Sequence, residues 1–336
     1  MALHDSHGVT IRDVAARAGV SPATVSRVFT RPEAVTPPTR QRVHSAAEEL
    51  RYTPHPVARS LARGRTGNIG LVVPDIAVAF SSVVVKAVAQ RARQDEHALF
   101  IADSDDRAAD EVRLARAMVP QVDGLLLLSP LMADHDLRDL ATAVPLVAVN
   151  RQHAGVPAVL MTSSTAAAQA VEHLHALGHR QLVYLSGPDN WSNAARLRAF
   201  SETCVRLGVH AEVLGSFEPT VSAGVRAADL VLAGPATGVL AYNDDVAVGV
   251  LSRLADRGVP VPGRVSVVGF DDTALASVIT PRLSTVRLPI GAAGVVAVTL
   301  LADALRGDDV AARGPVELPG EFVVRASTGP APDPIL

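Results

Sequence analysis

The sequence predicts an α/β protein with a small all-α domain at its N-terminus and a two-lobed body built on parallel sheets. Between residues 10 and 50 the apolar positions recur at helical spacing, whereas from residue 68 onward short apolar runs alternate with helical stretches. Such alternation is typical of parallel sheets covered by helices. It occurs as two similar series, near residues 69–149 and 164–268, which predicts two lobes.

Length and composition agree with this division. The 336 residues suffice for two or three domains, and a hydrophobic content of 48% supports a large core. No run of eighteen or more apolar residues and no signal-peptide pattern is found, so we expect a cytoplasmic protein with no membrane segment. The single cysteine, Cys204, cannot form an internal disulfide and is expected to be buried.

Charge is distributed unevenly along the chain. Residues 1–65 hold ten arginines against five acidic residues, a net charge of +5, so the rest of the chain carries −8 of the total of −3. A basic head on an acidic body is typical of a nucleic-acid-binding module joined to a separate ligand or assembly module.

The first elements form a helix-turn-helix pattern. Apolar residues at i, i+3, i+4 and i+7 from Ile11 to Ala18 predict one helix, and Gly19 can adopt the left-handed conformation that ends it. Ser21 can cap a second helix whose first residue is Pro22. Two short helices joined by a tight turn can place the second helix in the major groove of DNA.

The outward face of this second helix carries Pro22, Ala23, Ser26 and Arg27. Hydroxyl groups suit phosphate oxygens, and an arginine can bind the O6 and N7 atoms of guanine together. The small side chains of Pro22 and Ala23 offer only methyl-type contacts, so Arg27 is expected to supply most of the sequence discrimination.

A third helix and a linker follow. Thr36 is expected to cap the third helix, and its hydroxyl and that of Thr39 can bind phosphate near the helix start. An apolar face over residues 43–50 closes a three-helix core. Residues 53–67 are predicted to be a linker with two turns of helix, which is marginal in isolation.

The motif T-I-R-D-V-A-x-x-A-G-V-S-x-x-T-V-S-R-V, starting at Thr10, resembles the DNA-binding headpiece of the lactose repressor and galactose repressor family of bacterial transcriptional regulators. The likeness continues through V-x-x-x-T-R from Val35, Y-x-P from Tyr52 and V-A-R-S-L from Val57. It implies that the linker helix folds when two copies meet on operator DNA, with Leu61 wedged into the minor groove. The residues then expected to contact DNA are Thr10, Ser21, Pro22, Ala23, Thr24, Ser26, Arg27, Thr30, Thr36, Thr39, Val57, Ala58 and Leu61.

The resemblance also implies a periplasmic-binding-protein-like body that binds an effector and dimerises. The expected domains are a headpiece (1–52), a hinge helix and linker (53–67) and the body (68–336). Within the body the N-lobe covers about 68–160 and 288–321, and the C-lobe about 161–287 and 322–336, with crossovers near 159–162, 286–289 and 320–322. The C-terminus carries no leucine heptad, which favours a homodimer over a tetramer.

Ligands of open α/β sheets bind beyond the carboxyl ends of the strands. Polar and aromatic residues at those ends, most of them matching the family's inducer pocket, are Asp75, Phe80, Asp103, Asn150, Arg151, Arg196, Phe217, Asn243 and Asp271. All but Asp103 are expected to bind the effector. Carboxylate, amide and guanidinium groups bind paired hydroxyls, which favours a sugar or related polyol, although a nucleobase stays open.

Two departures from the family pattern concern the ligand's identity. The family often carries N-P-F-F in the first loop, where this chain has V-A-F-S at residues 78–81, and Asn150 replaces the usual acid before Arg151.

Other chemistries have little support. His173, His175 and His179 lie close in sequence, but a zinc site needs further ligands, and no metal or other cofactor is expected. No nucleophile elbow, phosphate-binding loop or Cys–His pair is found, so no catalytic residue is assigned. The chain is therefore expected to be a DNA-binding regulator, and more specifically a repressor, that binds a pseudo-palindromic double-stranded operator as a homodimer under effector control. The alternatives are a solute-binding protein without regulatory action, which the basic head and missing signal peptide oppose, and an α/β enzyme.

Overall fold

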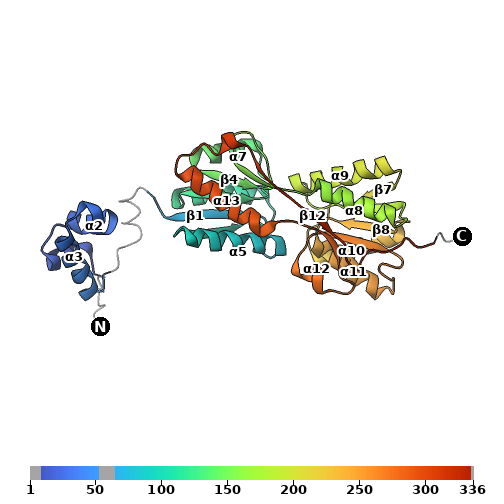
Figure 1. Ribbon diagram of the computed structural model, residues 1–336, viewed down its shortest axis with the longest axis horizontal. Coiled ribbons are helices and arrows are strands. Elements are labelled where there is room, and N and C mark those ends of the chain that lie inside the picture. Colours follow the sequence, from blue (N-terminus) through green and yellow to red (C-terminus); the bar gives the residue numbers. More distant parts are fainter. Residues whose placement is uncertain (1–8, 53–64, 334–336) are drawn as a thin grey trace. The chain divides into compact units, whose positions relative to one another are not determined.

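The computed structural model describes residues 9–52 and 65–333 (Figure 1). The chain divides into two compact units, one comprising residues 1–68 with 121–123 and the other residues 69–120 with 124–336. The expected hinge contacts Val57, Ala58 and Leu61 lie outside the described residues. No helix in the described part of the chain is long and apolar enough to cross a membrane.

The N-terminal domain is a three-helix bundle, as predicted. It contains α1 (Ile11–Ala18), α2 (Pro22–Thr30), the short 3₁₀ helix η1 (Pro32–Ala34) and α3 (Pro37–Glu49). The three helices bury one shared core because their apolar residues recur at helical spacing. That core consists of Val14, Ala15, Ala18, Val25, Val28, Val43, Ala46 and Ala47.

The helix ends follow the sequence signals with one exception. Gly19 ends α1 in the left-handed conformation, with φ of 64°. Ser21 caps α2, since its Oγ accepts the backbone N–H of Thr24 at 3.1 Å. Thr36 occupies the N-cap position of α3, but its side chain makes no capping bond and instead donates to Thr39 Oγ1 at 3.1 Å. The expected side-chain cap at Thr36 is therefore wrong.

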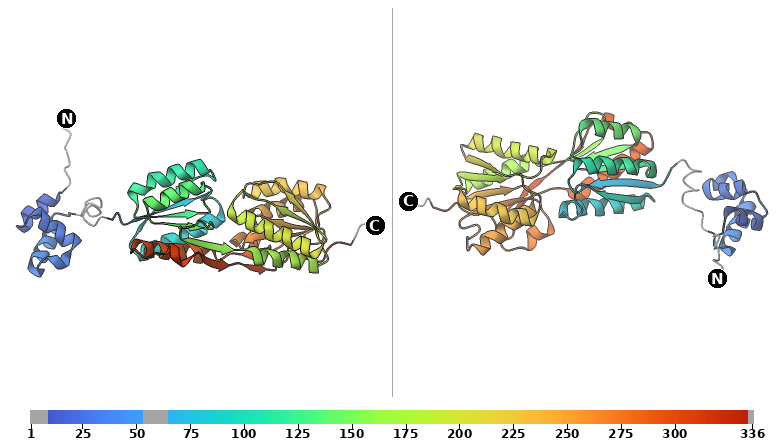
Figure 2. Two further views of the ribbon diagram at one scale, coloured as in Figure 1. Left: turned by 90° about the horizontal axis from the view of Figure 1, so that it is seen from above. Right: turned by 180° about the vertical axis from the view of Figure 1, so that it is seen from behind.

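The N-lobe is a six-stranded sheet with strand order β11-β5-β4-β3-β1-β2. Neighbouring strands are parallel at β1–β3, β3–β4, β4–β5 and β5–β11. Helices cover its two faces, as Figure 2 shows. The elements are β1 (Asn68–Val73), α5 (Ala79–Gln94), β2 (Ala98–Asp103), α6 (Ala108–Met118), η2 (Val119–Gln121), β3 (Gly124–Leu128), α7 (Asp134–Ala143), β4 (Leu146–Val149), β5 (Ala158–Thr162), α13 (Ile290–Leu305), η3 (Ala311–Arg313) and β11 (Val316–Pro319).

The C-lobe is a second six-stranded sheet with strand order β12-β10-β9-β8-β6-β7. It is parallel except at one edge, where β12 runs antiparallel to β10, a pairing the sequence pattern did not predict. Its elements are α8 (Ser164–Ala176), β6 (Gln181–Leu185), α9 (Trp191–Leu207), β7 (His210–Leu214), α10 (Val221–Ala233), β8 (Gly238–Ala241), α11 (Asp244–Asp256), β9 (Ser266–Asp271), α12 (Ala274–Val278), β10 (Ser284–Arg287) and β12 (Glu321–Val323).

The chain passes between the lobes three times. It leaves the N-lobe sheet after β5, returns after β10 into α13, and leaves again between β11 and β12. Helix α13 was not among the predicted helices, because a nearly continuous apolar run does not separate a buried helix from a buried strand. In the structure α13 packs against the N-lobe core through residues such as Ala293, Ala297 and Leu301.

Candidate functional site

The outward face of α2 is the candidate DNA-reading surface. Ser21, Pro22, Ala23 and Arg27 are exposed, while Val25 and Val28 are buried in the bundle. Within the described residues the Arg27 side chain takes part in no ion pair or hydrogen bond. An exposed guanidinium at this position is available to a base edge in the major groove.

Several of the hydroxyls expected to bind phosphate already donate inside the bundle. Thr10 donates to the Asp13 carboxylate at 2.7 Å, which lowers the pKa of Asp13. Thr30 donates to the backbone carbonyl of Ser26 at 2.8 Å, and one of the Ser21 and Thr24 hydroxyls donates to the other at 2.9 Å. Since a phosphate oxygen can only accept, these hydroxyls would have to give up an internal bond to contact DNA.

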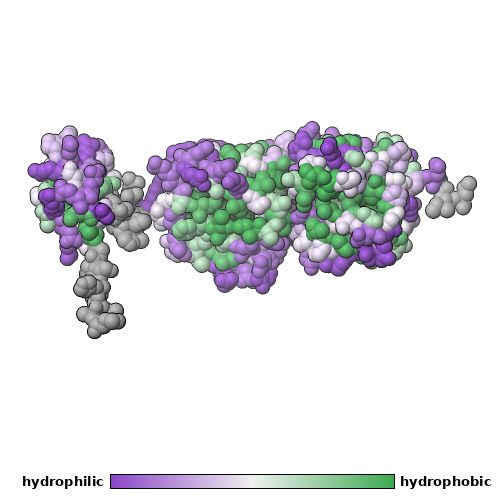
Figure 3. All heavy atoms as spheres, turned by 90° about the horizontal axis from the view of Figure 1, so that it is seen from below, coloured by the Kyte–Doolittle hydropathy of each residue, from purple (hydrophilic) through white to green (hydrophobic). Residues whose placement is uncertain are grey.

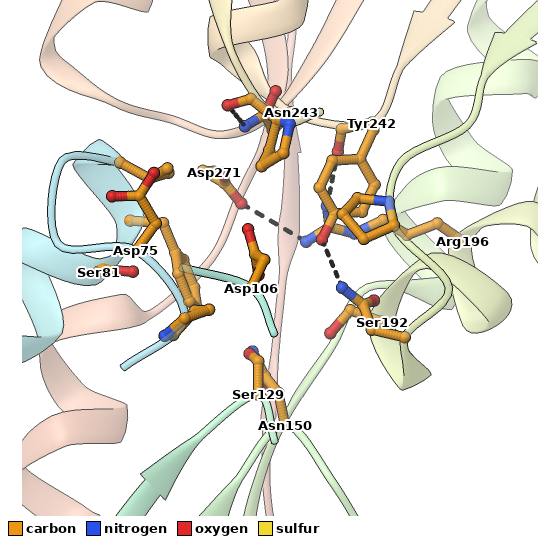
Figure 4. Close-up of a pocket in the computed structure, with 16 residues that line it drawn as sticks. Asp75, Ser81, Asp106, Ser129, Asn150, Ser192, Arg196, Tyr242, Asn243 and Asp271 are labelled. Atoms are coloured by element: carbon orange, nitrogen blue, oxygen red, sulfur yellow. Dashed lines mark hydrogen bonds and ion pairs between the residues drawn. The ribbon is translucent and has the colours of Figure 1, made fainter. Parts of the chain in front are cut away.

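The second candidate site is a pocket between the carboxyl ends of the strands of the two lobes. Six of the eight predicted effector residues line it, namely Asp75, Phe80, Asn150, Arg196, Asn243 and Asp271. Figure 4 shows Asp75 and Ser81 from the N-lobe facing Arg196, Tyr242 and Asp271 from the C-lobe.

Arg196 of α9 is the only cation among the pocket-lining residues, and it is 4% exposed. Its guanidinium lies between two aromatic rings, 5.0 Å from the Tyr242 centroid and 4.6 Å from the Phe270 centroid. Nη1 donates to the Tyr242 carbonyl at 2.6 Å, while Nε is buried without a hydrogen-bond partner. A buried donor left unpaired costs free energy, so this N–H favours a ligand that carries an acceptor.

Asp271 lies at the end of β9 and is paired with Arg196, Nη2 to Oδ1 at 3.5 Å. Burial raises the pKa of Asp271 to about 8, and Asp244 and Asp245 add to the rise while Arg196 opposes it. Its backbone has φ of 106°, a strained conformation for a residue with a side chain. Strained backbone and displaced pKa values both concentrate at functional sites.

Asn150 and Arg151 are adjacent in sequence, but only the Asn150 side chain faces the pocket. The left-handed backbone of Asn150, with φ of 60°, turns its amide toward the pocket, where Nδ2 donates to Ser129 Oγ at 3.4 Å. Arg151 points away and donates to the carbonyls of Pro130 and Met132 and to Asp134. Its guanidinium thus holds the loop after β3 and does not line the pocket.

Phe217 also lies outside this pocket, in a neighbouring cleft. Asn243 does line it, but its Oδ1 caps α11 by accepting the N–H of Val246 at 2.9 Å. Only its Nδ2, which donates to the Pro219 carbonyl at 3.2 Å, is turned to the loop beside the pocket.

Sequence reasoning missed several lining residues. They are Pro74, Val78, Ser81, Asp106, Ser129, Pro188, Asn190, Ser192, Pro219 and Tyr242. Tyr242 directly follows β8, so the strand-end rule could have selected it together with Asn243. Ser81 lies in the first turn of α5, and a rule that selects residues at strand ends cannot find it. Its hydroxyl is buried without a hydrogen-bond partner.

His173 and His179 of the histidine-rich stretch make structural contacts within the C-lobe. His179 is fully buried and its ring contacts Thr237 Oγ1 at 2.8 Å and Ser266 Oγ at 3.0 Å. His173 contacts Thr328 Oγ1 at 3.0 Å. Across residues 9–52 and 65–333, no three His, Cys, Asp or Glu side chains are arranged to hold a metal ion.

Two known protein families match this chain. The description "Bacterial regulatory proteins, lacI family" matches residues 10–55, and "Periplasmic binding protein-like domain" matches residues 171–328. The HTH-type transcriptional repressor CytR of Escherichia coli strain K12 is 32% identical over 332 residues, which cover 96% of this chain and 97% of CytR. The HTH-type transcriptional regulator GalR of the same strain is 35% identical over 84% of each chain.

Solved structures agree with these matches. The lac repressor dimer bound to operator and the anti-inducer ONPF superposes with a TM-score of 0.84 at 28% identity, covering 96% of this chain and 99% of that one. A complex of the transcriptional regulator CelR with cellobiose superposes with a TM-score of 0.69 at 28% identity, covering 95% and 99% of the two chains.

Proposed function

This chain belongs to the lacI family of bacterial transcriptional regulators, and we propose that it is a repressor whose affinity for operator DNA is controlled by a sugar or related polyol bound between its lobes. CytR and GalR are named as transcriptional regulators and not as enzymes, and this chain is likewise a non-enzymatic regulator.

The observation that carries the effector part is the composition of the pocket. Carboxylates and hydroxyls of the N-lobe, such as Asp75 and Ser81, face the Arg196 guanidinium and the Asp271 carboxyl group of the C-lobe. A polyol that binds both sets at once would stabilise one arrangement of the lobes over another. A ligand can shift a conformational equilibrium only through such a difference in affinity.

The DNA-binding part is supported by the exposed face of α2 and by the match of residues 10–55. We propose that Arg27 reads a base and that Ser26 and Thr39 contact phosphates, because Thr10, Thr30 and Thr36 donate elsewhere. The proposed hinge contacts Val57, Ala58 and Leu61 rest on the family resemblance.

We also propose a homodimer, since a pseudo-palindromic operator requires two headpieces. Apolar side chains are exposed at Val83 of α5, Phe100 and Ile101 of the edge strand β2, and Leu275 and Val278 of α12. Figure 3 shows hydrophobic residues gathered on a face that extends over both lobes. Large exposed apolar patches mark association surfaces in proteins. Sedimentation should give a dimer for the wild-type chain and a monomer for Val278→Asp combined with Phe100→Asp.

The function is tested with the full-length protein. Duplexes bound from a random library are enriched and sequenced, and binding of the recovered site is then followed by fluorescence anisotropy during titration with sugars and polyols. We expect a pseudo-palindromic site and a change in its dissociation constant with one ligand. Recovery of no preferred duplex, with or without these ligands, would contradict the proposal.

A further inference from the structure

One carboxylate holds the chain at the point where it enters the body. Asp123 directly precedes β3, and Thr66 and Gly67 directly precede β1. Oδ1 of Asp123 accepts the backbone N–H of Thr66 at 2.6 Å and the Thr66 hydroxyl at 3.0 Å, while Oδ2 accepts the backbone N–H of Gly67 at 2.8 Å. The two oxygens of one carboxylate therefore bind two consecutive peptide groups, which fixes the orientation of both.

Further hydrogen bonds close this arrangement. Oγ1 of Thr66 accepts the backbone N–H of Asn68 at 3.1 Å, and Nδ2 of Asn68 donates to the Gln121 carbonyl at 3.0 Å. The Asn68 carbonyl in turn accepts the backbone N–H of Asp123 at 2.8 Å. We call these residues the entry clasp, namely Thr66, Gly67, Asn68, Gln121 and Asp123.

The strands that follow the entry clasp are held by the core of the N-lobe. β1 and β3 are parallel neighbours, with Ile69 opposite Gly124. The first residue of β3 lies close to α13, since a Cβ at Gly124 would be 2.7 Å from Cδ1 of Leu301. Asp123 is covalently joined to this strand, so its carboxylate cannot shift far without disturbing the packing of β3.

The bonds from Asp123 are needed because Gly67 gives the chain little direction of its own. Its backbone is left-handed, with φ of 75°, and among the described residues no atom outside its own chain neighbours would lie within 4 Å of a Cβ at this position. Glycine adopts many backbone conformations at similar free energy. Without the carboxylate, neither a side chain nor close packing would fix the path of the chain at residue 67.

This path matters for a protein that binds two half-sites at once. When one headpiece is bound, the effective concentration of the second at its half-site depends on the stiffness of the connection. A stiff connection concentrates the second headpiece at one spacing, whereas a flexible connection spreads it over several. The rigidity of the chain at the entry clasp therefore affects which half-site spacing is bound.

We propose that Asp123 is a positioning residue for operator recognition, which fixes the direction in which the chain leaves the body and so makes the dimer selective for the spacing of its two half-sites. This inference rests on the proposed function, because it requires a homodimer on a pseudo-palindromic operator. If Asp123 only stabilised the amino ends of β1 and β3, its loss would lower stability without changing the preferred spacing.

Fluorescence anisotropy with the full-length protein tests the proposal on the duplex recovered from the random library. Three further duplexes carry one base pair more at the centre, one base pair fewer, or a single half-site. Each added base pair turns one half-site by about 35° and moves it by about 3.4 Å. We expect the wild-type protein to bind both altered spacings about tenfold or more weakly than the recovered site. Equal binding of all three spacings by the wild type would overturn the proposal.

Asp123→Ala is expected to weaken binding of the recovered site about tenfold and to bind both altered spacings within about threefold of that site. Its affinity for the single half-site should stay within about twofold of wild type, because the headpiece itself is unchanged. Asp123→Asn keeps the size of the side chain and one acceptor oxygen, so its spacing preference should be intermediate. It decides the question if thermal unfolding shows that Asp123→Ala is not folded.

Asp309→Ala is the matched control. Oδ1 of Asp309 accepts the backbone N–H of Ala312 at 3.2 Å in the same lobe, and Asp309 is not part of the entry clasp. We expect Asp309→Ala to keep the spacing preference of the wild type. A wild-type spacing preference in folded Asp123→Ala and Asp123→Asn would overturn the role of Asp123.

Limited trypsin digestion gives a second readout that needs no operator. Trypsin cleaves after arginine, and the bond between Arg65 and Thr66 carries the N–H that Asp123 accepts. Cleavage requires the backbone around this bond to open, so Asp123→Ala should raise the rate about fivefold or more, as measured by mass spectrometry of the fragments. Asp309→Ala should leave the rate unchanged. Equal rates in wild type and Asp123→Ala would contradict the anchoring of the chain by Asp123.

The two readouts separate this inference from the proposed function. A preferred duplex whose spacing matters equally to wild type and Asp123→Ala would overturn the positioning role and leave the regulatory function intact. Recovery of no preferred duplex would contradict the proposed function and the spacing selectivity together, whatever the rate of cleavage after Arg65.

Discussion

Arg196 and Asp271 meet in the pocket between the lobes as a buried pair, Nη2 to Oδ1 at 3.5 Å, although they lie 75 residues apart in the chain. The contact is long for a charge-assisted hydrogen bond, in which donor and acceptor atoms usually lie about 2.7–2.9 Å apart. The pair is therefore loosely coupled, and a ligand hydroxyl that bridges the two groups can improve the hydrogen bonding of both.

Arg196→Ala is expected to weaken effector binding about 10- to 100-fold, because it removes the only cation of the pocket and leaves Asp271 buried without its partner. The measurement is the shift of operator affinity during effector titration. Arg196→Lys keeps the charge but not the planar donor fork, so it should restore only part of the response. A full response in Arg196→Ala would assign the effector to another site.

Asp271→Asn is expected to flatten the pH dependence of stability. The folded protein holds the Asp271 proton up to about pH 8, whereas the unfolded chain releases it near the ordinary value of 3.8. Over this range the folded state binds more protons, so the contribution of Asp271 to the free energy of unfolding falls as pH rises. Urea denaturation from about pH 5 to pH 8 measures this slope in both proteins. An identical slope for wild type and Asp271→Asn would argue against an elevated pKa.

His179→Asn tests the opposite pH dependence, in which stability is lost as the pH falls. Burial lowers the pKa of His179 below its ordinary value of 6.5, so the folded state binds fewer protons than the unfolded chain. Stability contributed by neutral His179 is present above about pH 6.5 and is lost as pH falls. The substitution should lower overall stability yet make it less sensitive to acid between about pH 6.5 and pH 5, as followed by thermal unfolding. Unaltered acid sensitivity would exclude His179 as the titrating group.

Arg27→Ala is expected to cost about 1–3 kcal/mol at the cognate operator and to relax base preference at one position of each half-site. Arg12→Ala is the matched control, since Arg12 is an exposed arginine of α1 that is not on the outward face of α2. If Arg12 contacts only phosphate, Arg12→Ala weakens the binding of all duplexes about equally. Unchanged discrimination among operator variants by Arg27→Ala would reject its role as the base reader.

Much of the fold could be predicted because its signals are local. The spacing of Val14, Ala15 and Ala18 and the cap at Ser21 predict the headpiece from neighbouring residues, and all are confirmed. The two series of strands within residues 69–149 and 164–268 were also predicted, although β5 was not, since an apolar run between turn residues is itself the signal. Helix α13 and the antiparallel strand β12 were not, because their assignment depends on what they pack against.

Local patterns in the sequence were enough to predict that a basic helix-turn-helix unit precedes a two-lobed α/β body, and that polar residues gather at the carboxyl ends of its strands. Which of those residues face one cavity became clear only from the folded chain. The Asn150 amide faces the pocket from a left-handed backbone, whereas the neighbouring Arg151 side chain points away from it. Ser81 reaches the pocket from the first turn of α5. Side-chain direction at a strand end depends on loop dihedral angles set by long-range packing, which residue order alone does not specify.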